Sequence, residues 1–164
     1  MIILFGFKSC GKTTLGKRTA GSLDCPFIDL DDVMVHLYDA SLTNRQIFQK
    51  IGEPAFRALE SRALASLSRY KGILSVGGGT VLDENNLSKL KTLGTLVYLE
   101  TDKVTLAKRI FAEDTPAIFK NRSFEELYEE RKPIYESIDA IKLDTSDKTI
   151  DQLVTELSRI FHGQ

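Results

Sequence analysis

The sequence predicts an α/β fold in which helices cover both faces of a five-stranded parallel sheet. Short apolar runs alternate with longer segments of helical periodicity, an order that is typical of βαβ units. Most of the apolar runs are nearly continuous, as expected for strands that are buried on both faces. The chain has 164 residues, which suits one domain of roughly 150 residues. We therefore expect residues 1–164 to form a single domain.

The elements follow one another regularly along the chain. The expected strands are residues 2–5, 26–29, 73–76, 95–99 and 140–143. The expected helices are residues 12–23, 32–38, 53–70, 84–93, 103–112, 124–135 and 150–161. In the longest of these helices, apolar residues fall on one stripe and charged residues lie off it, as in a helix with one buried face. Its stripe consists of Phe56, Leu59, Ala63, Leu64 and Leu67.

One segment interrupts this regular order. Residues 113–123 lack periodicity and contain Pro116. An irregular insert of this length in a small domain is more often functional than a passive connection. We therefore expect a lid at about residues 113–123.

Charge and composition exclude several classes of protein. Lys and Arg number 22 against 23 Asp and Glu, so the net charge of −1 gives no general attraction to nucleic acid or anionic membranes. The apolar opening at residues 1–5 is far shorter than the roughly 20 residues of a membrane span, and no basic segment precedes it. The two cysteines, Cys10 and Cys25, are too few for a disulfide framework, and their spacing does not match a zinc site. We expect a cytoplasmic protein without nucleic-acid or membrane partners.

A glycine-rich loop lies between the first expected strand and the first expected helix. Residues 6–13 read GFKSCGKT and match the phosphate-binding pattern G-x-x-x-x-G-K-S/T. In such a loop, backbone N–H groups and the helix N-terminus surround phosphates, Lys12 reaches the β- and γ-phosphates, and the Thr13 hydroxyl ligates Mg²⁺. Ser9 is expected to avoid a positive φ so that the loop closes normally. The predicted nucleotide ligands in this segment are Gly6, Lys8, Ser9, Cys10, Gly11, Lys12, Thr13 and Thr14.

Two carboxylates stand at the end of the second expected strand. Asp29 and Asp31 are two residues apart, so strand geometry points both toward the crevice where α/β sheets bind ligands. Asp29 is predicted to hold Mg²⁺ through water. Asp31 is predicted to act as general base or to orient the acceptor hydroxyl, and with Lys12 it forms the predicted catalytic pair. The alternative is that Asp31 and Asp32 only cap the next helix.

With the phosphate loop in place, the chain resembles the shikimate kinases, small P-loop kinases of the nucleoside-monophosphate kinase type. The resemblance spans about residues 1–161 and rests on four more segments. Residues 27–31 (FIDLD) resemble F-x-D-x-D, residues 52–60 resemble G-E-x-x-F-R-x-x-E, residues 76–79 read VGGG, and residues 131–135 (RKPIY) resemble R-x-P-L-Y. The resemblance implies that a monomeric enzyme uses ATP and Mg²⁺ to phosphorylate the 3-hydroxyl of shikimate, a step of aromatic amino-acid biosynthesis.

The resemblance also implies where shikimate binds. Arg57 and Arg131 would grip its carboxylate, and Glu60 would orient it. The glycines after the third strand, Gly77, Gly78 and Gly79, would let the substrate approach the backbone closely. The alternatives are an i,i+3 surface pair for Arg57 and Glu60, a flexible turn for the glycines and a solvated side chain for Arg131.

At the nucleotide end, the resemblance implies that Arg109 stacks on adenine and that residues 144–147 lie near the base. The lid departs from the family pattern R-P-L-L, because the aligned residues 115–118 read TPAI and Thr115 stands where the arginine is expected. We expect Arg122, or less readily Lys120, to reach the phosphates on closure instead. The alternative is that Arg122 is solvated or belongs to the start of the next helix.

Two other functions stay open at this point. A related kinase could act on another hydroxy acid such as gluconate. The chain could also be a nucleotide-binding switch or a catalytically silent sensor. A GTPase-type switch is disfavoured because the strand ending at Val76 leads into three glycines rather than Asp-x-x-Gly, and no Asn-Lys-x-Asp occurs. A silent sensor is supported only by the missing lid arginine.

Overall fold

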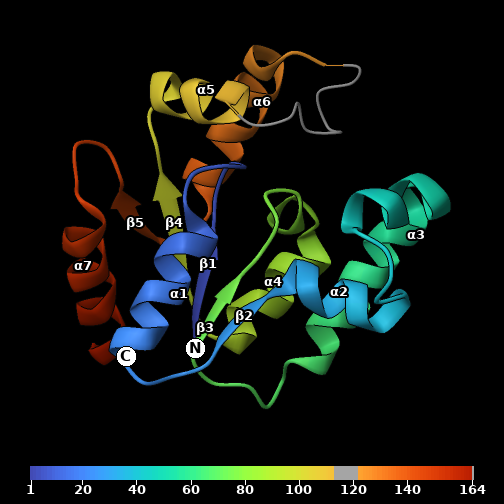
Figure 1. Ribbon diagram of the computed structural model, residues 1–164, viewed down its shortest axis with the longest axis horizontal. Helices are drawn as coiled ribbons and strands as arrows, with labels where there is room; N and C mark the ends of the chain where they lie inside the picture. Colours follow the sequence, from blue (N-terminus) through green and yellow to red (C-terminus); the bar gives the residue numbers. More distant parts are fainter. Residues whose placement is uncertain (113–121, 164) are drawn as a thin grey trace.

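Five parallel strands form one sheet in the order β2-β3-β1-β4-β5 (Figure 1). The computed structural model describes residues 1–112 and 122–163. The strands are β1 (Ile2–Phe5), β2 (Phe27–Asp29), β3 (Ile73–Ser75), β4 (Thr95–Glu100) and β5 (Ile141–Asp144). Because β1 pairs with both β3 and β4, the loop after β1 lies at the centre of the edge formed by the carboxyl ends of the strands. The predicted five-stranded parallel sheet is confirmed.

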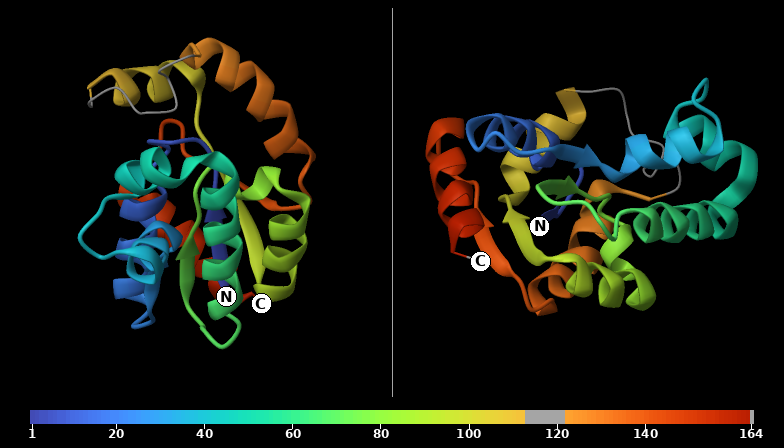
Figure 2. Two further views of the ribbon diagram at one scale, coloured as in Figure 1. Left: turned by 90° about the vertical axis from the view of Figure 1, so that its right-hand side faces the viewer. Right: turned by 90° about the horizontal axis from the view of Figure 1, so that it is seen from below.

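Helices cover both faces of this sheet (Figure 2). α1 (Lys12–Ser22) packs beside α7 (Ile150–His162) on one face, and α4 (Glu84–Leu93) and the end of α6 (Phe124–Ser137) cover the other. α2 (Leu30–Tyr38) packs on α3 (Asn44–Ser66) near the β2 edge. α5 (Lys103–Ala112) lies with the start of α6 above the carboxyl edge, and a 3₁₀ turn, η1 (Thr80–Leu82), precedes α4.

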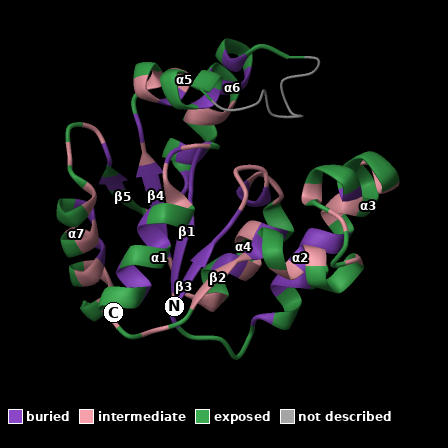
Figure 3. Ribbon diagram, in the orientation of Figure 1, coloured by how far each residue is buried: buried purple, intermediate pink, exposed green. Residues whose placement is uncertain are grey.

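The apolar core follows the strands. All residues of β1 and β3 are buried, and Figure 3 shows the buried residues continuing from the strands into the inner sides of the helices. Burial on both faces explains why these strands read as nearly continuous apolar runs in the sequence. Within the described residues, no helix is both long enough and apolar enough to cross a membrane.

An aromatic cluster fixes α6 against the loop after β1. The ring of Tyr135 lies 5.4 Å from Phe7, 5.6 Å from Tyr98 and 6.0 Å from Phe5. Phe7 also stacks on Tyr128 at 5.2 Å. Each such pair contributes about 0.5–1.5 kcal/mol beyond the burial of its area. The cluster therefore holds α6 in a defined position over the carboxyl edge.

The helix boundaries differ from prediction mainly in α3. This helix begins at Asn44 rather than 53, and it ends at Ser66 rather than 70. Gly52 has φ 75° and divides it into two helical stretches, and Pro54 opens the second stretch, where a missing N–H costs nothing. The first stretch starts with a capping box between Thr43 and Gln46, a signal that the sequence contained. Residues 113–121 of the predicted lid lie outside the described residues.

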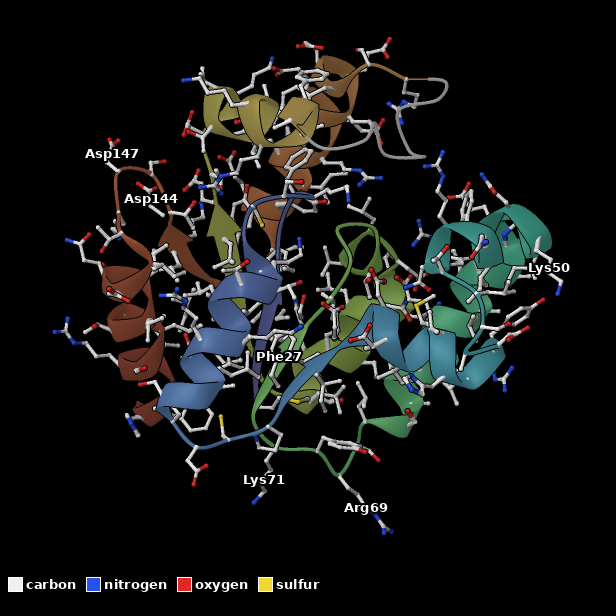
Figure 4. All side chains as sticks on the ribbon, in the orientation of Figure 1. Phe27, Lys50, Arg69, Lys71, Asp144 and Asp147 are labelled. Carbon is white, nitrogen blue, oxygen red and sulfur yellow. The ribbon has the colours of Figure 1, made fainter. Side chains whose placement is uncertain are left out.

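Gly72 provides a test of the packing at the amino end of the sheet, the edge marked by Lys71 in Figure 4. Its φ is 121°, and an added Cβ would lie 2.2 Å from the Pro26 carbonyl oxygen. Strain and overlap together predict that Gly72→Ala lowers the free energy of unfolding by roughly 3 kcal/mol. Urea denaturation measures the loss.

Gly21→Ala is the matched control. Gly21 lies exposed in α1, and no described atom comes within 4 Å of the position of its Cβ. Alanine should therefore stabilise the protein by about 0.5–1 kcal/mol, through helix propensity alone. Equal effects of the two substitutions would contradict the close contact at Gly72.

Candidate active site

The loop between β1 and α1 has the backbone that phosphate binding requires. Gly6 and Gly11 have φ of 145° and 100°. A Cβ on Gly6 would lie 2.8 Å from the Leu99 carbonyl oxygen, so only glycine fits there. Gly11 caps α1 without a side-chain hydrogen bond from any described residue. The first N–H groups of α1 are thus available to an anion.

Ser9 corrects one expectation from the sequence. Its φ is 63°, so the prediction that Ser9 avoids a positive φ is wrong. A left-handed residue inside such a loop turns successive N–H groups toward the same side, which forms an anion-binding concavity. The cost of this conformation in a non-glycine residue is of the order of 1 kcal/mol. Its carbonyl accepts a hydrogen bond of 3.3 Å from Arg109 Nη1.

Lys12 lies folded back across this concavity. Its Nζ donates to the carbonyl oxygens of Phe7 at 2.7 Å and Gly6 at 3.1 Å, and it lies 3.6 Å from Cys10 Sγ. Cys10 is buried, and its Sγ would lie 3.2 Å from a Cβ on Gly6, so this side chain packs inside the loop. Phosphate oxygens carry more negative charge than carbonyl oxygens, so a bound polyphosphate can take over these hydrogen bonds.

Thr13 and Asp29 meet at the beginning of α2. Thr13 Oγ1 donates to Asp29 Oδ2 at 3.0 Å, and Asp29 Oδ1 accepts from the Asp31 N–H at 3.2 Å. Asp29 is therefore the N-cap of α2, which begins at Leu30 and not at 32, so the alternative that Asp31 and Asp32 provide the cap is wrong.

The Thr13 hydroxyl and the Asp29 carboxylate suit magnesium. Both supply hard oxygen ligands, which Mg²⁺ prefers. In the described parts of the chain, no group of three or more His, Cys, Asp or Glu side chains could hold a metal ion. A magnesium ion at this pair must complete its shell with water and substrate phosphates, which is its usual mode in phosphoryl-transfer enzymes.

The carboxyl group of Asp31 has an unusual electrostatic environment. The residue is accessible from solvent, but the surrounding walls desolvate its carboxyl group. This desolvation, together with the nearby charges of Asp29 and Glu60, raises the pKa of Asp31 to about 6, while Lys12 acts in the opposite direction. The carboxyl group of Asp31 thus interacts with both the lysine of the phosphate loop and the buried Glu60.

Glu60 anchors the far side of the site. It is only 3% exposed, and its Oε2 accepts from Arg57 Nη1 at 3.0 Å. Its Oε1 accepts from the Thr80 hydroxyl at 2.6 Å, a partner that sequence reasoning missed. Arg57 also faces Glu53 at 3.7 Å. Because Glu60 is buried, the alternative of a simple surface pair is wrong.

The glycines after β3 are packed between charged side chains rather than forming a loose turn. A Cβ on Gly79 would lie 2.7 Å from Arg57 Nη2. A Cβ on Gly78 would lie 2.8 Å from Tyr135 Oη, 3.0 Å from the Gly6 carbonyl oxygen and 3.6 Å from Arg131 Nη1. The structure thus brings together the predicted residues from four separate segments at one place.

Arg131, beside Gly78, has a hydrogen-bond donor without a partner in the described residues. Its Nε is buried and has no hydrogen-bond partner among residues 1–112 and 122–163. An orphaned guanidinium N–H is costly unless a ligand accepts it. A carboxylate is the geometric match for this planar group, which favours a binding role over the solvated alternative.

A cavity of about 460 Å³ adjoins the phosphate loop. Its walls are formed by residues 8–15 and by Arg109, Thr145, Lys148, Ile150 and Leu153. The predicted segment 144–147 therefore contributes Thr145. Figure 4 labels Asp144 at the end of β5 and Asp147 in the loop that follows. Sequence reasoning missed Lys148, Ile150 and Leu153. Their place after the last parallel strand was the available signal.

Of the residues named in the lid predictions, the described part of the chain includes Arg122. Its guanidinium pairs with Glu130 of α6, in agreement with the alternative that it belongs to the start of the next helix. Thr115 and Lys120 lie outside the described residues. A movement of Arg122 over the phosphates on closure stays a prediction.

Comparisons with known proteins identify the family of the chain. The family model described as shikimate kinase matches residues 8–161. The shikimate kinase of Enterococcus faecalis is 36% identical over 162 residues, which cover 95% of each chain. The crystal structure of shikimate kinase from Aquifex aeolicus superposes with a TM-score of 0.78 at 32% identity, over 99% of this chain and 97% of that one.

A second solved structure is the shikimate kinase from Acinetobacter baumannii in complex with shikimate. It has a TM-score of 0.86 and 26% identity, over 99% of this chain and 92% of that one. Sequence and fold thus match over nearly the whole length. The chain belongs to the shikimate kinase family.

Proposed function

We propose that the chain transfers the γ-phosphoryl group of ATP to the 3-hydroxyl of shikimate, giving shikimate 3-phosphate for aromatic amino-acid biosynthesis. The observation that carries this proposal is the electrostatic environment of Asp31. Its carboxyl group is desolvated and interacts with the charges of Asp29, Glu60 and Lys12. A base close to the lysine of the phosphate loop and to Glu60, which pairs with Arg57, suits phosphorylation of a hydroxyl on an anionic substrate.

The nucleotide side acts by positioning and charge. Lys12 and the N–H groups of the loop hold the β- and γ-phosphates, and Arg109 closes the cavity over the loop. Thr13 and, through water, Asp29 hold Mg²⁺, which the 3.0 Å contact between their oxygens supports. When bound, Mg²⁺ neutralises charge on the transferred phosphoryl group.

The acceptor side aligns the hydroxyl of the substrate. Arg131 and Arg57 bind the carboxylate, and the backbone of Gly78 and Gly79 forms the floor against which the ring lies. The hydroxyl oxygen attacks the γ-phosphorus as the bond to ADP breaks, and its proton passes to Asp31. The proposal includes a monomeric, cytoplasmic enzyme. Support comes from a site assembled within one chain and from the free thiols of Cys10 and Cys25.

A coupled assay of ADP release tests the function. Turnover should depend on shikimate, exceed turnover with gluconate, and stop in excess EDTA. Lys12→Ala should abolish transfer while preserving the melting temperature, because its ammonium contacts loop carbonyls and not the core. A rate of ADP release that does not depend on shikimate would contradict the proposal. The absence of ADP release with any acceptor would favour a silent sensor.

Asp31→Asn separates catalysis from stability. The variant should lower kcat by about 10²- to 10⁴-fold, because it removes the proton acceptor. In the wild type, kcat/KM for shikimate should fall as the pH drops below about 6, where Asp31 becomes protonated. Initial rates between pH 5 and pH 8 check both statements.

The same substitution should stabilise the fold at neutral pH. The pKa of Asp31 in the folded state lies above its ordinary value, so ionisation opposes folding. The variant should melt above the wild type at pH 7.5, and the difference should shrink as the pH falls from about 6 to about 4. A difference that grows on acidification would contradict the assigned environment.

Arg131→Ala and Arg57→Ala should both weaken shikimate binding but should differ in their effect on stability. Both should raise KM for shikimate by about 30-fold or more and leave KM for ATP nearly unchanged, because a buried substrate carboxylate loses a partner. Arg57→Ala should also lower the melting temperature, because it leaves the buried Glu60 without its cation. Arg62→Ala, at an exposed position of the same helix, is the control. Unchanged KM in both variants would favour solvated arginines.

A further inference from the structure

The hydroxyl of Tyr135 lies beside Gly78 and Arg131, two residues that the proposed function assigns to substrate binding. Tyr135 is the largest fully buried side chain of the described residues and comes from α6. Its Oη donates to the Gly78 carbonyl oxygen at 2.7 Å, across 57 positions of the sequence. Burial raises the pKa of Tyr135 to about 12, so this hydroxyl remains a proton donor throughout the working pH range.

Arg131 lies close to the same hydroxyl. Its positive charge acts on Tyr135, and both Arg131 Nη1 and Tyr135 Oη border the position of a Cβ on Gly78, at 3.6 Å and 2.8 Å. A hydroxyl that donates to a carbonyl keeps its lone pairs for a neighbouring cation. Tyr135 therefore connects the backbone at Gly78 to the guanidinium that carries the unpartnered Nε.

The ring that carries this hydroxyl cannot shift easily. Phe5, Phe7 and Tyr98 surround it with ring centroids 5.4–6.0 Å away, in edge or tilted arrangements. Two of these rings belong to the central strands, and Phe7 belongs to the phosphate loop. Contacts with these rings therefore fix the position of the hydroxyl, independently of the arginine.

We propose that Tyr135 is a positioning residue for the substrate carboxylate: it holds the guanidinium of Arg131 and the peptide of Gly78 in the arrangement that receives that group. This inference rests on the proposed function. Arginine has a long side chain, and fixing its planar head before binding lowers the entropy that the complex loses. Without the hydroxyl, the arginine keeps its charge but loses its fixed direction.

Tyr135→Phe tests the proposal, because it retains the packed ring and removes only the hydroxyl. KM for shikimate should rise about tenfold, the effect of one buried hydrogen bond, with KM for ATP and kcat within about twofold of wild type. With the methyl ester of shikimate, which carries no carboxylate, the same substitution should change KM less than about threefold. Tyr98→Phe is the matched control, since its ring packs on Tyr135 in the same cluster.

A second pair of variants measures the connection to Arg131. Arg131→Lys keeps the charge and loses the planar fork. If Tyr135 acts through this arginine, adding Tyr135→Phe to Arg131→Lys should raise KM less than about threefold further. A full additional tenfold loss would overturn the proposal. The melting temperature of each variant and its KM for ATP report whether the protein is folded.

The remaining outcomes are also decisive. Unchanged KM in Tyr135→Phe, an equal loss for shikimate and its ester, an equal rise in KM for ATP, or the same effect in Tyr98→Phe would each overturn the positioning role. The wild type reports separately on the proposed function. If the wild type does not turn over shikimate, the function fails. If it does and only the variant ratios disagree, the function stands and the role of Tyr135 fails.

Discussion

The contact between the loops after β1 and β3 sets the geometry on which the rest of the site depends. The Gly6 carbonyl oxygen accepts a hydrogen bond from Lys12 and lies 3.0 Å from the position of a Cβ on Gly78. The Gly6 peptide group therefore contacts both Lys12 and the backbone at Gly78, which we propose face the phosphates and the acceptor. Parallel pairing of β1 with β3 makes this approach possible, because both loops leave the same edge of the sheet. The topology of the sheet thus makes the proposed donor and acceptor sites adjacent.

The site also concentrates charges that would be unfavourable elsewhere. Asp29, Asp31 and Glu60 lie near one another. Desolvation, and after it the charges of Asp29 and Glu60, raises the pKa of Asp31 to about 6. Arg57 offsets the charge of Glu60 directly, and Lys12 lowers the cost at Asp31. The favourable free energy of burying the apolar core offsets the unfavourable electrostatic free energy of this cluster. Strain at functional sites is commonly offset in this way.

Sequence reasoning located the sheet and the phosphate loop because their signals are local. Apolar runs report strand burial, and residues 6–13 fit a pattern whose spacing follows from phosphate chemistry. The roles of Tyr135 and Thr80 depend on contacts across 57 and 20 positions, which no local pattern contains. Ser9 was misjudged for a different reason. The propensity of a residue predicts its usual φ, but the loop as a whole selects the conformation that aligns its N–H groups.

The capping role of Asp29 limits which residues this position can tolerate. One of its oxygens begins α2, and the other accepts from Thr13. Asparagine caps helices as well as aspartate but would bring no negative charge to a metal. Glutamate would keep the charge, but it is not among the side chains that cap helix N-termini well. Aspartate alone combines both properties, so purifying selection at residue 29 should be stricter than either helix capping or metal binding would impose separately.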